Sequence, residues 1–298
     1  MNSLPHSKLL RWYKANARAF PWRRTKSPYR ILLSEIMAQQ TQVQRVVLFY
    51  NPWLKRFPTL TALARASKLD VLTHWSGLGY NNRALRLHRL AREVVDKPGA
   101  ILPRSIGELR KLPGVGRYTA HAVACFAFGQ EVAVVDVNIR RVFSRMFWSV
   151  QSAAELKPEK DIWSLAEMHL PALHAAQWNQ ALMDLGALIC TARRPLCAVC
   201  PINSSCASAF SKNFAKKIPP REKMEPSFKG VPRRIYRGRI LKALHKKPLT
   251  SREIGMSVVS RFHPRDLTWI ESVLKRMEFD DLVTIRGTGN RRRIQIAE

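Results

Sequence analysis

The amino-acid sequence predicts a mostly α-helical protein that ends in a small, separate module of mixed structure. Before residue 190, apolar residues recur at helical spacing, and long alternating strand patterns are missing. Beyond a basic, proline-containing stretch at 212–232, three helical segments precede a β-hairpin pattern. The chain has 298 residues and a hydrophobic content of 46%, which is enough for two or three packed units.

Proline and glycine divide the first two-thirds of the chain into helices of ordinary length. Both residue types disfavour continuation of a helix. The expected breaks are Asn51-Pro52, Phe57-Pro58, Lys97-Pro98-Gly99, Leu102-Pro103 and Lys157-Pro158. A helix pattern at 29–42 precedes the first of these breaks.

The stretch at 212–232 has the basic and proline-containing composition of a linker. We therefore expect one domain at 1–211 and a second domain at 233–298. The elements expected in the second domain are helices at 235–245, 248–254 and 266–279, and strands at 282–286 and 291–296. Thr250 precedes Glu253 by three residues, as in a capping box, and glycines mark the turn of the hairpin. This order resembles a winged helix.

A large positive charge predicts a polyanionic partner. The 51 Lys and Arg face 21 Asp and Glu, which gives a formal net charge of +30. From residue 226 onward the corresponding counts are 17 and 7. We expect DNA as the partner, with the wing residues Arg291, Arg292 and Arg293 on its phosphates. The alternative for this module is a protein-docking domain with a solvated basic face.

No segment of the sequence predicts attachment to a membrane. No apolar run approaches the ~20 residues of a spanning helix, and no lipidation signal is found. The beginning, Met1-Asn2-Ser3-Leu4-Pro5, lacks the charged and apolar regions of a secretory signal. We expect a monomer in the cytoplasm, associated with the nucleoid in a bacterial cell.

Four of the five cysteines lie within seventeen residues. Cys190, Cys197, Cys200 and Cys206 follow the spacing C-x6-C-x2-C-x5-C, whereas Cys125 stands in an apolar stretch as a small core residue. In a reducing compartment such a group favours metal binding over disulfides. Four thiolates can hold a cubane iron–sulfur cluster or a tetrahedral zinc ion, and the spacing alone does not choose between them.

A glycine-rich turn, Leu112-Pro113-Gly114-Val115-Gly116, separates two helical patterns. Glycine lets the backbone come close to a partner, and the N–H groups that open the following helix can meet a phosphate oxygen. By itself the turn fits equally well as a tight connection between two helices.

Two acidic residues stand where they could take part in chemistry. Asp136 follows the apolar run 132–135 and has the position of a helix N-cap. Glu35 lies in a pattern that is otherwise apolar on its first turns, where desolvation raises a carboxyl pKa and suits a general acid. The structural interpretations are a cap for Asp136 and a paired or exposed side chain for Glu35.

Several motifs together resemble the endonuclease III and MutY superfamily of DNA glycosylases. The cysteine spacing resembles the cluster loop of that family, and the turn at 112–116 resembles its helix-hairpin-helix. The string L-S-E-I-M-A-Q-Q-T-Q-V at 33–43 is similar to the MutY adenine glycosylases. The resemblance runs from about Trp12 to Cys206. It implies a two-lobed helix-hairpin-helix fold with a [4Fe–4S] cluster, acting on double-stranded DNA that contains a mismatch.

The same resemblance assigns catalytic roles in hydrolysis of the bond between adenine and its sugar. Glu35 would protonate the purine, while Asp136, grouped with Asn138, would stabilise the sugar cation. Tyr118 occupies the position at which bifunctional relatives carry a Schiff-base lysine. A monofunctional glycosylase is therefore expected.

Further residues are assigned to the base pocket and to DNA by this resemblance. Trp22 and Arg23 match the start of the adenine pocket, and Gln40 and Tyr80 match residues that wedge into the base stack and support flipping. Contacts to the DNA backbone are assigned to Leu112, Gly114, Val115 and Gly116.

Three departures from the family pattern keep other functions open. The C-terminal module does not look like the Nudix-like domain with which MutY proteins check for 8-oxoguanine. Val137 follows Asp136 where MutY commonly has glycine, and Ala38 and Asn81-Asn82 alter the expected pocket. We expect excision of adenine opposite guanine or 8-oxoguanine. The alternatives are excision of thymine or uracil opposite guanine, and a non-catalytic DNA-binding protein.

Overall fold

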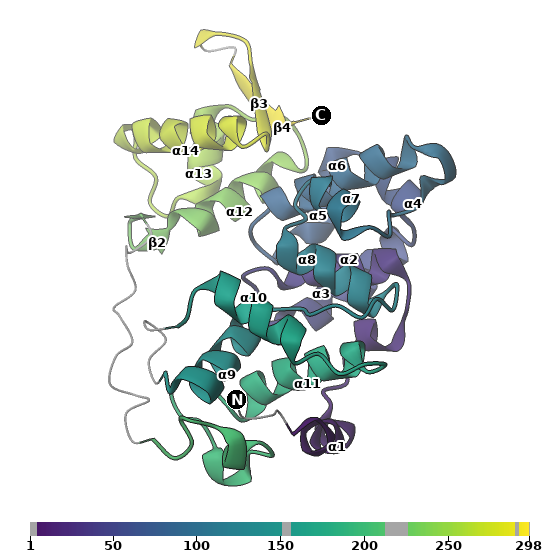
Figure 1. Cartoon of the computed structure of the whole chain (residues 1–298). Helices are drawn as coiled ribbons and strands as arrows, with labels where there is room; N and C mark the ends of the chain where they lie inside the picture. Colours follow the sequence, from purple (N-terminus) through teal and green to yellow (C-terminus); the bar gives the residue numbers. More distant parts are fainter. Residues whose placement is uncertain (1–4, 151–155, 212–225, 290–291, 298) are drawn as a thin grey trace. The chain divides into compact units, whose positions relative to one another are not determined.

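The computed structural model describes residues 5–150, 156–211, 226–289 and 292–297 (Figure 1). The chain divides into two units. The first comprises 1–32, 103–111 and 115–222, and the second comprises 33–102, 112–114 and 223–298. Both units are dominated by helices, which confirms the predicted fold class.

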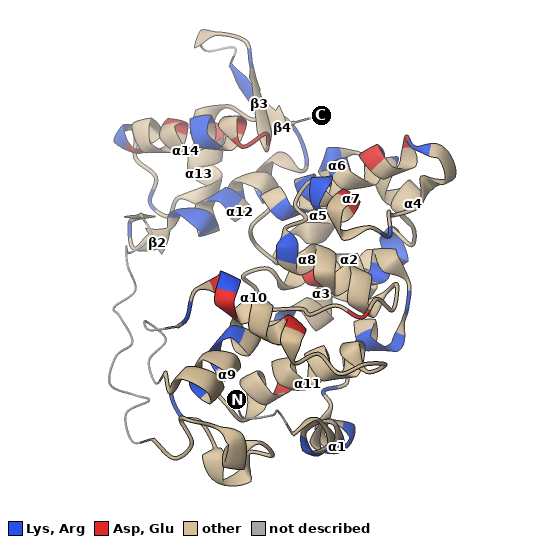
Figure 2. Ribbon diagram, in the orientation of Figure 1, with Lys and Arg blue, Asp and Glu red and all other residues tan. Residues whose placement is uncertain are grey.

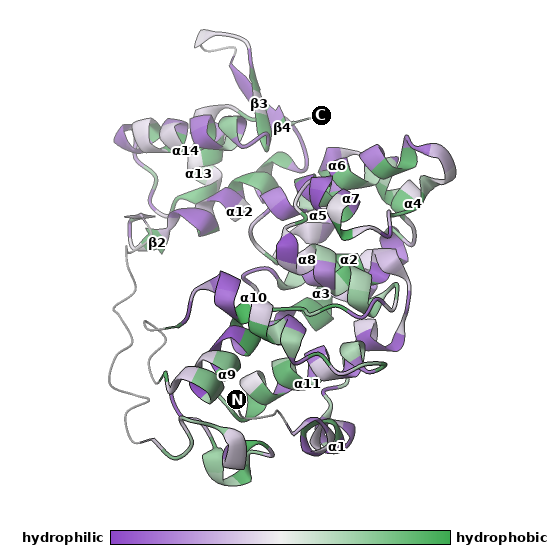
Figure 3. Ribbon diagram, in the orientation of Figure 1, coloured by the Kyte–Doolittle hydropathy of each residue, from purple (hydrophilic) through white to green (hydrophobic). Residues whose placement is uncertain are grey.

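The first unit is built around a long apolar helix, α11, which packs against α1 and α9. Figure 3 shows α11 as a mostly hydrophobic ribbon. Trp178 of α11 and Trp163 of α10 are fully buried. The helices are α1 (His6–Asn16), α7 (Ile106–Lys111), α8 (Arg117–Phe126), α9 (Val137–Trp148), α10 (Glu159–Met168) and α11 (Ala175–Leu188), with short 3-10 turns η1 (Pro21–Arg24), η4 (Cys197–Val199) and η5 (Asn203–Ser205).

The N-terminal half of the second unit packs around α6. Leu87 and Leu90 of this helix are fully buried, and α4 and α5 lie against it. Trp53 and Trp75 meet edge to face at 5.2 Å in the same core. The elements are α3 (Val43–Arg56), α4 (Leu60–Ala64), α5 (Lys68–Trp75), α6 (Asn82–Val95) and η2 (Pro98–Ala100), while α2 (Pro28–Ala38) begins in the first unit and ends in the second.

The C-terminal part of the second unit has the predicted three helices and antiparallel hairpin. Thr250 and Glu253 form the expected capping box. Strand β3 pairs with β4 in a register that places Val283 opposite Ile296. The elements are β1 (Ser227–Phe228), β2 (Val231–Pro232), α12 (Arg233–Leu244), α13 (Ser251–Val258), η6 (Pro264–Asp266), α14 (Leu267–Phe279), β3 (Val283–Arg286) and β4 (Arg293–Ile296). The domain boundaries stay a prediction, since residues 212–225 of the linker lie outside the described part.

Two details of the predicted helices are wrong. The expected break at Asn51-Pro52 is absent, because α3 continues through Pro52 to Arg56. Tyr50 and Trp53 on either side of this proline are buried, and their packing outweighs the local cost of proline. The pattern at 29–42 also ends early, because α2 stops at Ala38 and Gln40 adopts a left-handed backbone conformation with φ of 54°.

No helix in the described ranges combines the length and the apolar character needed to span a bilayer.

Candidate functional site

Asp136 caps the first turn of α9. Its Oδ1 accepts a hydrogen bond from the backbone N–H of Ile139 at 2.7 Å, and its Oδ2 accepts one from Nδ2 of Asn138 at 2.7 Å. Burial raises the pKa of the Asp136 carboxyl, and these hydrogen bonds oppose the increase. The predicted N-cap is thus confirmed, and the same contacts hold the carboxyl group in a fixed position.

A chain of side-chain contacts connects Asp136 with the cysteine loop. Arg141 donates from Nη2 to Oδ1 of Asn138 at 2.8 Å and from Nε to the carbonyl oxygen of Cys190 at 2.8 Å. Gly186 permits the close approach of α9 and α11, since a Cβ atom there would lie 2.6 Å from Cβ of Asn138. The candidate catalytic carboxylate and the first cysteine are therefore parts of one hydrogen-bonded network.

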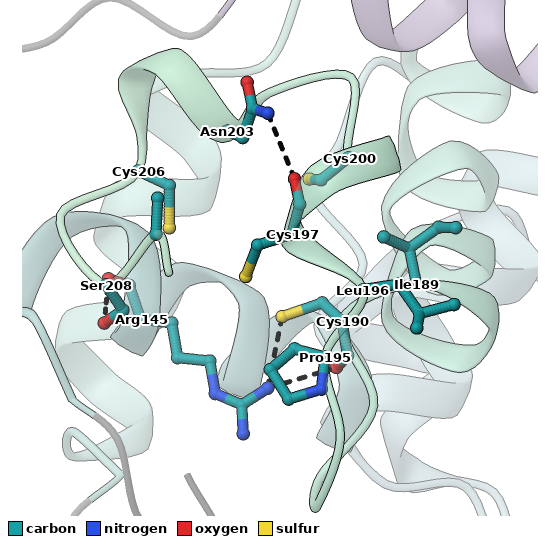
Figure 4. Close-up of a pocket in the computed structure, with 11 residues that line it drawn as sticks. Arg145, Ile189, Cys190, Pro195, Leu196, Cys197, Cys200, Asn203, Cys206 and Ser208 are labelled. Carbon is teal, nitrogen blue, oxygen red and sulfur yellow. Dashed lines mark hydrogen bonds between the residues drawn. The ribbon is translucent and has the colours of Figure 1, made fainter. Parts of the chain in front are cut away.

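The four cysteines of the loop line one pocket (Figure 4). Arg145, which is only 2% exposed, closes one side of it. Its Nη1 donates to Sγ of Cys190 at 3.3 Å and to the carbonyl oxygen of Thr191 at 2.7 Å, and its Nη2 donates to that of Ala192 at 2.8 Å. Asn203 donates to the carbonyl oxygen of Cys197 at 3.0 Å. The loop is thereby held in shape by α9 and by its own amide side chain.

The donor set of four cysteine thiols fits a cubane iron–sulfur cluster, which takes one thiolate per iron. Within the described ranges, no three His, Cys, Asp or Glu side chains lie close enough together to share one metal ion. A tetrahedral zinc site requires all four sulfurs at about 2.3 Å from the same ion, whereas in a cubane each thiolate binds a different iron. Burial raises the pKa of Cys200 to about 12 and also raises that of Cys206. Both thiols are therefore protonated at neutral pH in the absence of a bound metal.

Glu35 lies in the second unit, on the part of α2 whose side chains are almost all buried. Its exposed fraction is 9%, and its neighbours Ser34 and Ile36 are also buried. This environment agrees with the desolvation expected for a general acid. Asp136 belongs to the first unit, and the catalytic roles of both residues stay predictions.

Gln40 and Tyr80 lie on exposed turns of the second unit. Both adopt left-handed conformations, with φ of 54° and 50°, and 56% of Tyr80 is exposed. A large aromatic side chain this exposed, on a strained backbone, is a feature of binding surfaces. The two turns converge on the guanidinium of Arg83, which donates to the carbonyl oxygens of Gln39 and Gly79.

The glycine-rich turn connects α7 to α8, and its contact with the DNA backbone stays a prediction. Leu112 and Val115 are buried and anchor it. Gly114 has φ of 81°, and a Cβ there would lie 3.2 Å from Cβ of Arg86. Gly116 is the N-cap of α8 and offers no side chain to the first N–H groups of that helix.

Trp22 and Tyr118 are half-buried in the first unit. Trp22 stacks on Phe20 with ring centroids 4.9 Å apart. Tyr118 stands in the first turn of α8. Contact of either residue with DNA stays a prediction.

Arg23 makes a structural contact that the sequence did not predict. It donates from Nη1 and Nη2 to the two carboxylate oxygens of Asp184, at 2.7 and 2.9 Å. Arg18 donates to the same carboxylate, which is fully buried. Burial disfavours the charge of Asp184, but the hydrogen bonds and charge of Arg23 and Arg18 lower its pKa overall.

Three charged residues that hold the site in shape were not predicted from the sequence, but they have one sequence feature in common. Each is a charged side chain among the buried residues of a helix, where the sequence pattern calls for an apolar one. They are Arg83 on α6, Arg145 on α9 and Asp184 on α11.

Two protein-family models match the chain. Residues 33–168 match the model of the HhH-GPD superfamily of base excision DNA repair proteins, and residues 190–206 match the iron–sulfur binding domain of endonuclease III. Among solved structures, a thermostable thymine-DNA glycosylase is 33% identical with a TM-score of 0.63, covering 68% of this chain and 94% of its own. A non-covalent endonuclease III–DNA complex shares the fold, with a TM-score of 0.58 at 23% identity over 67% of this chain and 92% of its own.

Two curated relatives show how far the similarity extends. The adenine DNA glycosylase of Mycobacterium tuberculosis is 39% identical over 279 residues, which is 93% of this chain and 89% of that protein. That match is too long to leave out the C-terminal module. The human adenine DNA glycosylase is 42% identical over 207 residues, 66% of this chain but 38% of the human protein. The chain belongs to the adenine DNA glycosylase family of base excision repair enzymes, and it binds an iron–sulfur cluster.

Proposed function

We propose that this enzyme hydrolyses the N-glycosidic bond of adenine mispaired with guanine or 8-oxoguanine in double-stranded DNA. The observation that carries the proposal is the 39% identity to an adenine DNA glycosylase over 93% of the chain. Retention of Glu35 in a buried position and of Asp136 in a fixed one supports a catalytic protein over a binding protein.

The proposed mechanism assigns one task to each acid. Glu35 donates a proton to the extruded purine, which leaves as the neutral base with the bonding electron pair. The ionised carboxylate of Asp136, oriented by Asn138, stabilises the positive charge that develops on the sugar. Water then adds at the anomeric carbon and loses a proton, which leaves an abasic site. Tyr118 has no amine with which to form an imine, so strand cleavage does not follow.

When bound, the iron–sulfur cluster supplies bonds from iron to Cys190, Cys197, Cys200 and Cys206 that cross-link residues 190–206. The residues around it, including Arg145, orient the loop against α9. We assign it a supporting role because the catalytic acids lie on other segments.

The DNA surface is proposed to include the C-terminal module. Asp266 pairs with Lys229 at 2.6 Å and Asp280 with Arg237 at 2.7 Å within the module, while Asp281 pairs with Lys68 outside it. The 17 Lys and Arg from residue 226 onward exceed the 7 Asp and Glu, and this excess of positive charge (Figure 2) supports contact with phosphates. Arg292 and Arg293 lie at the wing, while Arg291 is outside the described residues. We further propose that the enzyme acts as a monomer on DNA in the cytoplasm.

A second candidate substrate is thymine opposite guanine. The observation that favours it is the structural similarity to a thymine-DNA glycosylase, with 33% identity and a TM-score of 0.63. Two mycobacterial adenine DNA glycosylases are more similar in sequence, at 39% and 43% identity.

The two candidates are separated by one assay. End-labelled duplexes carrying A opposite 8-oxoguanine, A opposite G, T opposite G and U opposite G are incubated with the enzyme and then treated with alkali. Cleavage at adenine supports the proposal and ranks the opposing bases. Cleavage only at T or U assigns the enzyme to the pyrimidine mismatch class, and no cleavage in any duplex supports the binding-protein alternative.

A further inference from the structure

Arg83 is a buried cation that has no acidic partner among the residues that the structure describes. It lies in the first turn of α6, with 7% of its surface exposed, in line with the buried residues Leu87 and Leu90. Within the described ranges it forms no ion pair, and carbonyl and hydroxyl oxygens surround its guanidinium instead. Burial lowers its pKa to about 10, so the side chain is charged at neutral pH. A buried arginine is retained in a core only if its donors have specific partners.

The first set of partners belongs to the turn that carries Gln40. Nη1 of Arg83 donates to the carbonyl oxygens of Ile36 at 3.0 Å and Met37 at 2.7 Å, and also to that of Gln39. Nη2 donates to the hydroxyl of Thr41 at 3.0 Å. These contacts satisfy the last carbonyls of α2 and surround Gln40 on both sides.

The second set belongs to the turn that carries Tyr80. Nη2 of Arg83 donates to the carbonyl oxygen of Gly79 at 3.0 Å, and Nε lies 3.4 Å from that of Tyr80. The guanidinium also lies over the rings of Trp75 and Tyr80, at 5.3 and 5.4 Å from their centroids. Trp75 donates its indole N–H to the same Gly79 oxygen at 2.9 Å. One side chain thus joins two turns that are about 40 residues apart in sequence.

We propose that Arg83 is a positioning residue that fixes the Gln40 and Tyr80 turns in one geometry, so that both side chains enter the base stack together and extrude the target nucleotide. The inference rests on the proposed function for its substrate. Gln40 and Tyr80 hold left-handed conformations that non-glycine residues rarely adopt, so an external constraint is required at both turns. Arg83 supplies it by binding the carbonyl oxygens adjacent to each.

The planar guanidinium is needed because its five donors point in fixed directions toward both turns. A lysine at this position keeps the charge, but its three donors all lie on one nitrogen atom. That nitrogen cannot reach the oxygens of both turns at once. Arg83→Lys therefore tests whether the planar arrangement of donors is needed in addition to the positive charge. Arg92→Lys is the matched control, since Arg92 lies on the same helix and donates to the carbonyl oxygen of Ala64, away from both turns.

The test measures extrusion separately from chemistry. A duplex with 2-aminopurine at the target position opposite guanine reports unstacking as a rise in fluorescence. For Arg83→Lys we expect an amplitude at least fivefold below that of the wild type, and a single-turnover excision rate at least tenfold lower. Affinity for a fully paired duplex should change less than twofold, and Arg92→Lys should match the wild type throughout. Thermal melting and the absorbance near 400 nm establish that each variant is folded with its cluster.

Each other outcome has a defined meaning. Wild-type fluorescence amplitude in Arg83→Lys overturns the inference, whether or not excision is slower. Absence of unstacking by the wild-type enzyme also overturns it, because the two turns then do not act as a wedge. If the wild type unstacks 2-aminopurine but releases no adenine from any duplex, the proposed substrate is wrong, while the fluorescence comparison still decides the role of Arg83.

Discussion

Arg23 binds both carboxylate oxygens of Asp184, at 2.7 and 2.9 Å, although the two residues are 161 positions apart in sequence. Asp184 is fully buried on α11, and the backbone N–H of Arg18 donates to it as well. The contact fixes residues 18–23 against α11, the helix that ends just before Cys190. The ion pair therefore joins the segment around Trp22, which resembles the start of the adenine pocket, to α11, the helix that precedes the cluster loop.

Asp184→Asn should destabilise the protein strongly. The substitution leaves the charges of Arg18 and Arg23 without their buried partner, and loss of one member of such a pair costs about 3–5 kcal/mol. Urea denaturation measures the change in the free energy of unfolding. Lys111→Met, which breaks an exposed pair with Glu108, should cost no more than about 1 kcal/mol. Equal losses in the two variants would contradict the assignment.

Asn138→Ala should move the acid limb of the activity profile to higher pH. Burial already raises the pKa of Asp136, and the amide of Asn138 opposes that effect by donating to its Oδ2. Without this donor the pKa rises further, so the carboxylate is lost at a higher pH as the solution is acidified. Single-turnover rates measured across the acid range give the midpoint. An unchanged midpoint would show that Asn138 does not control the ionisation of Asp136.

Arg145→Met should make the iron–sulfur cluster more labile. The arginine donates to Sγ of Cys190 and to the carbonyl oxygens of Thr191 and Ala192, and methionine leaves these oxygens without a donor. We expect faster loss of absorbance near 400 nm under oxidation or chelation. Arg140→Met is the control on the same helix, because Arg140 contacts the carbonyl oxygen of Lys157 instead. Identical decay in both variants would contradict this role.

Replacing Arg292 and Arg293 by glutamine should weaken DNA binding in a salt-dependent manner. If each contacts one phosphate, the slope of log K against log salt falls by about 1.8 in magnitude for the double variant. Fluorescence anisotropy at several salt concentrations gives the slope. Arg276→Gln should leave it nearly unchanged, because Arg276 lies on α14 and not on the wing. An unaltered slope for the double variant would support the protein-docking interpretation of the module.

The sequence predicted those parts of the fold that depend on interactions between residues a few positions apart. The Asp136 cap and the Thr250 capping box involve partners three residues away, so the sequence shows both members. The continuation of α3 through Pro52 depends on burial of Tyr50 and Trp53 in the core, which no local pattern reports. Tertiary packing there outweighs the local preference of proline.

The supporting residues of the site could not be found in the same way. Arg83 contacts residues up to 47 positions away, and Arg141 reaches Cys190 across 49 positions. Nothing in the neighbouring sequence of either arginine specifies its partner. The only available signal was a charge among the buried positions of an amphipathic helix. Glu35 and Gln40, in contrast, belong to a contiguous motif, so family resemblance alone assigns them a role.

The central claim is tested most directly by single-turnover release of adenine from a duplex with adenine opposite guanine, comparing the wild type with Glu35→Gln. The account predicts alkali-labile cleavage at adenine by the wild type and a rate lower by about 10²–10⁴-fold in the variant, the range expected for loss of a general acid. Melting temperature and affinity for the duplex should be preserved. No adenine release by the wild type, or equal rates in the two proteins, would contradict the account.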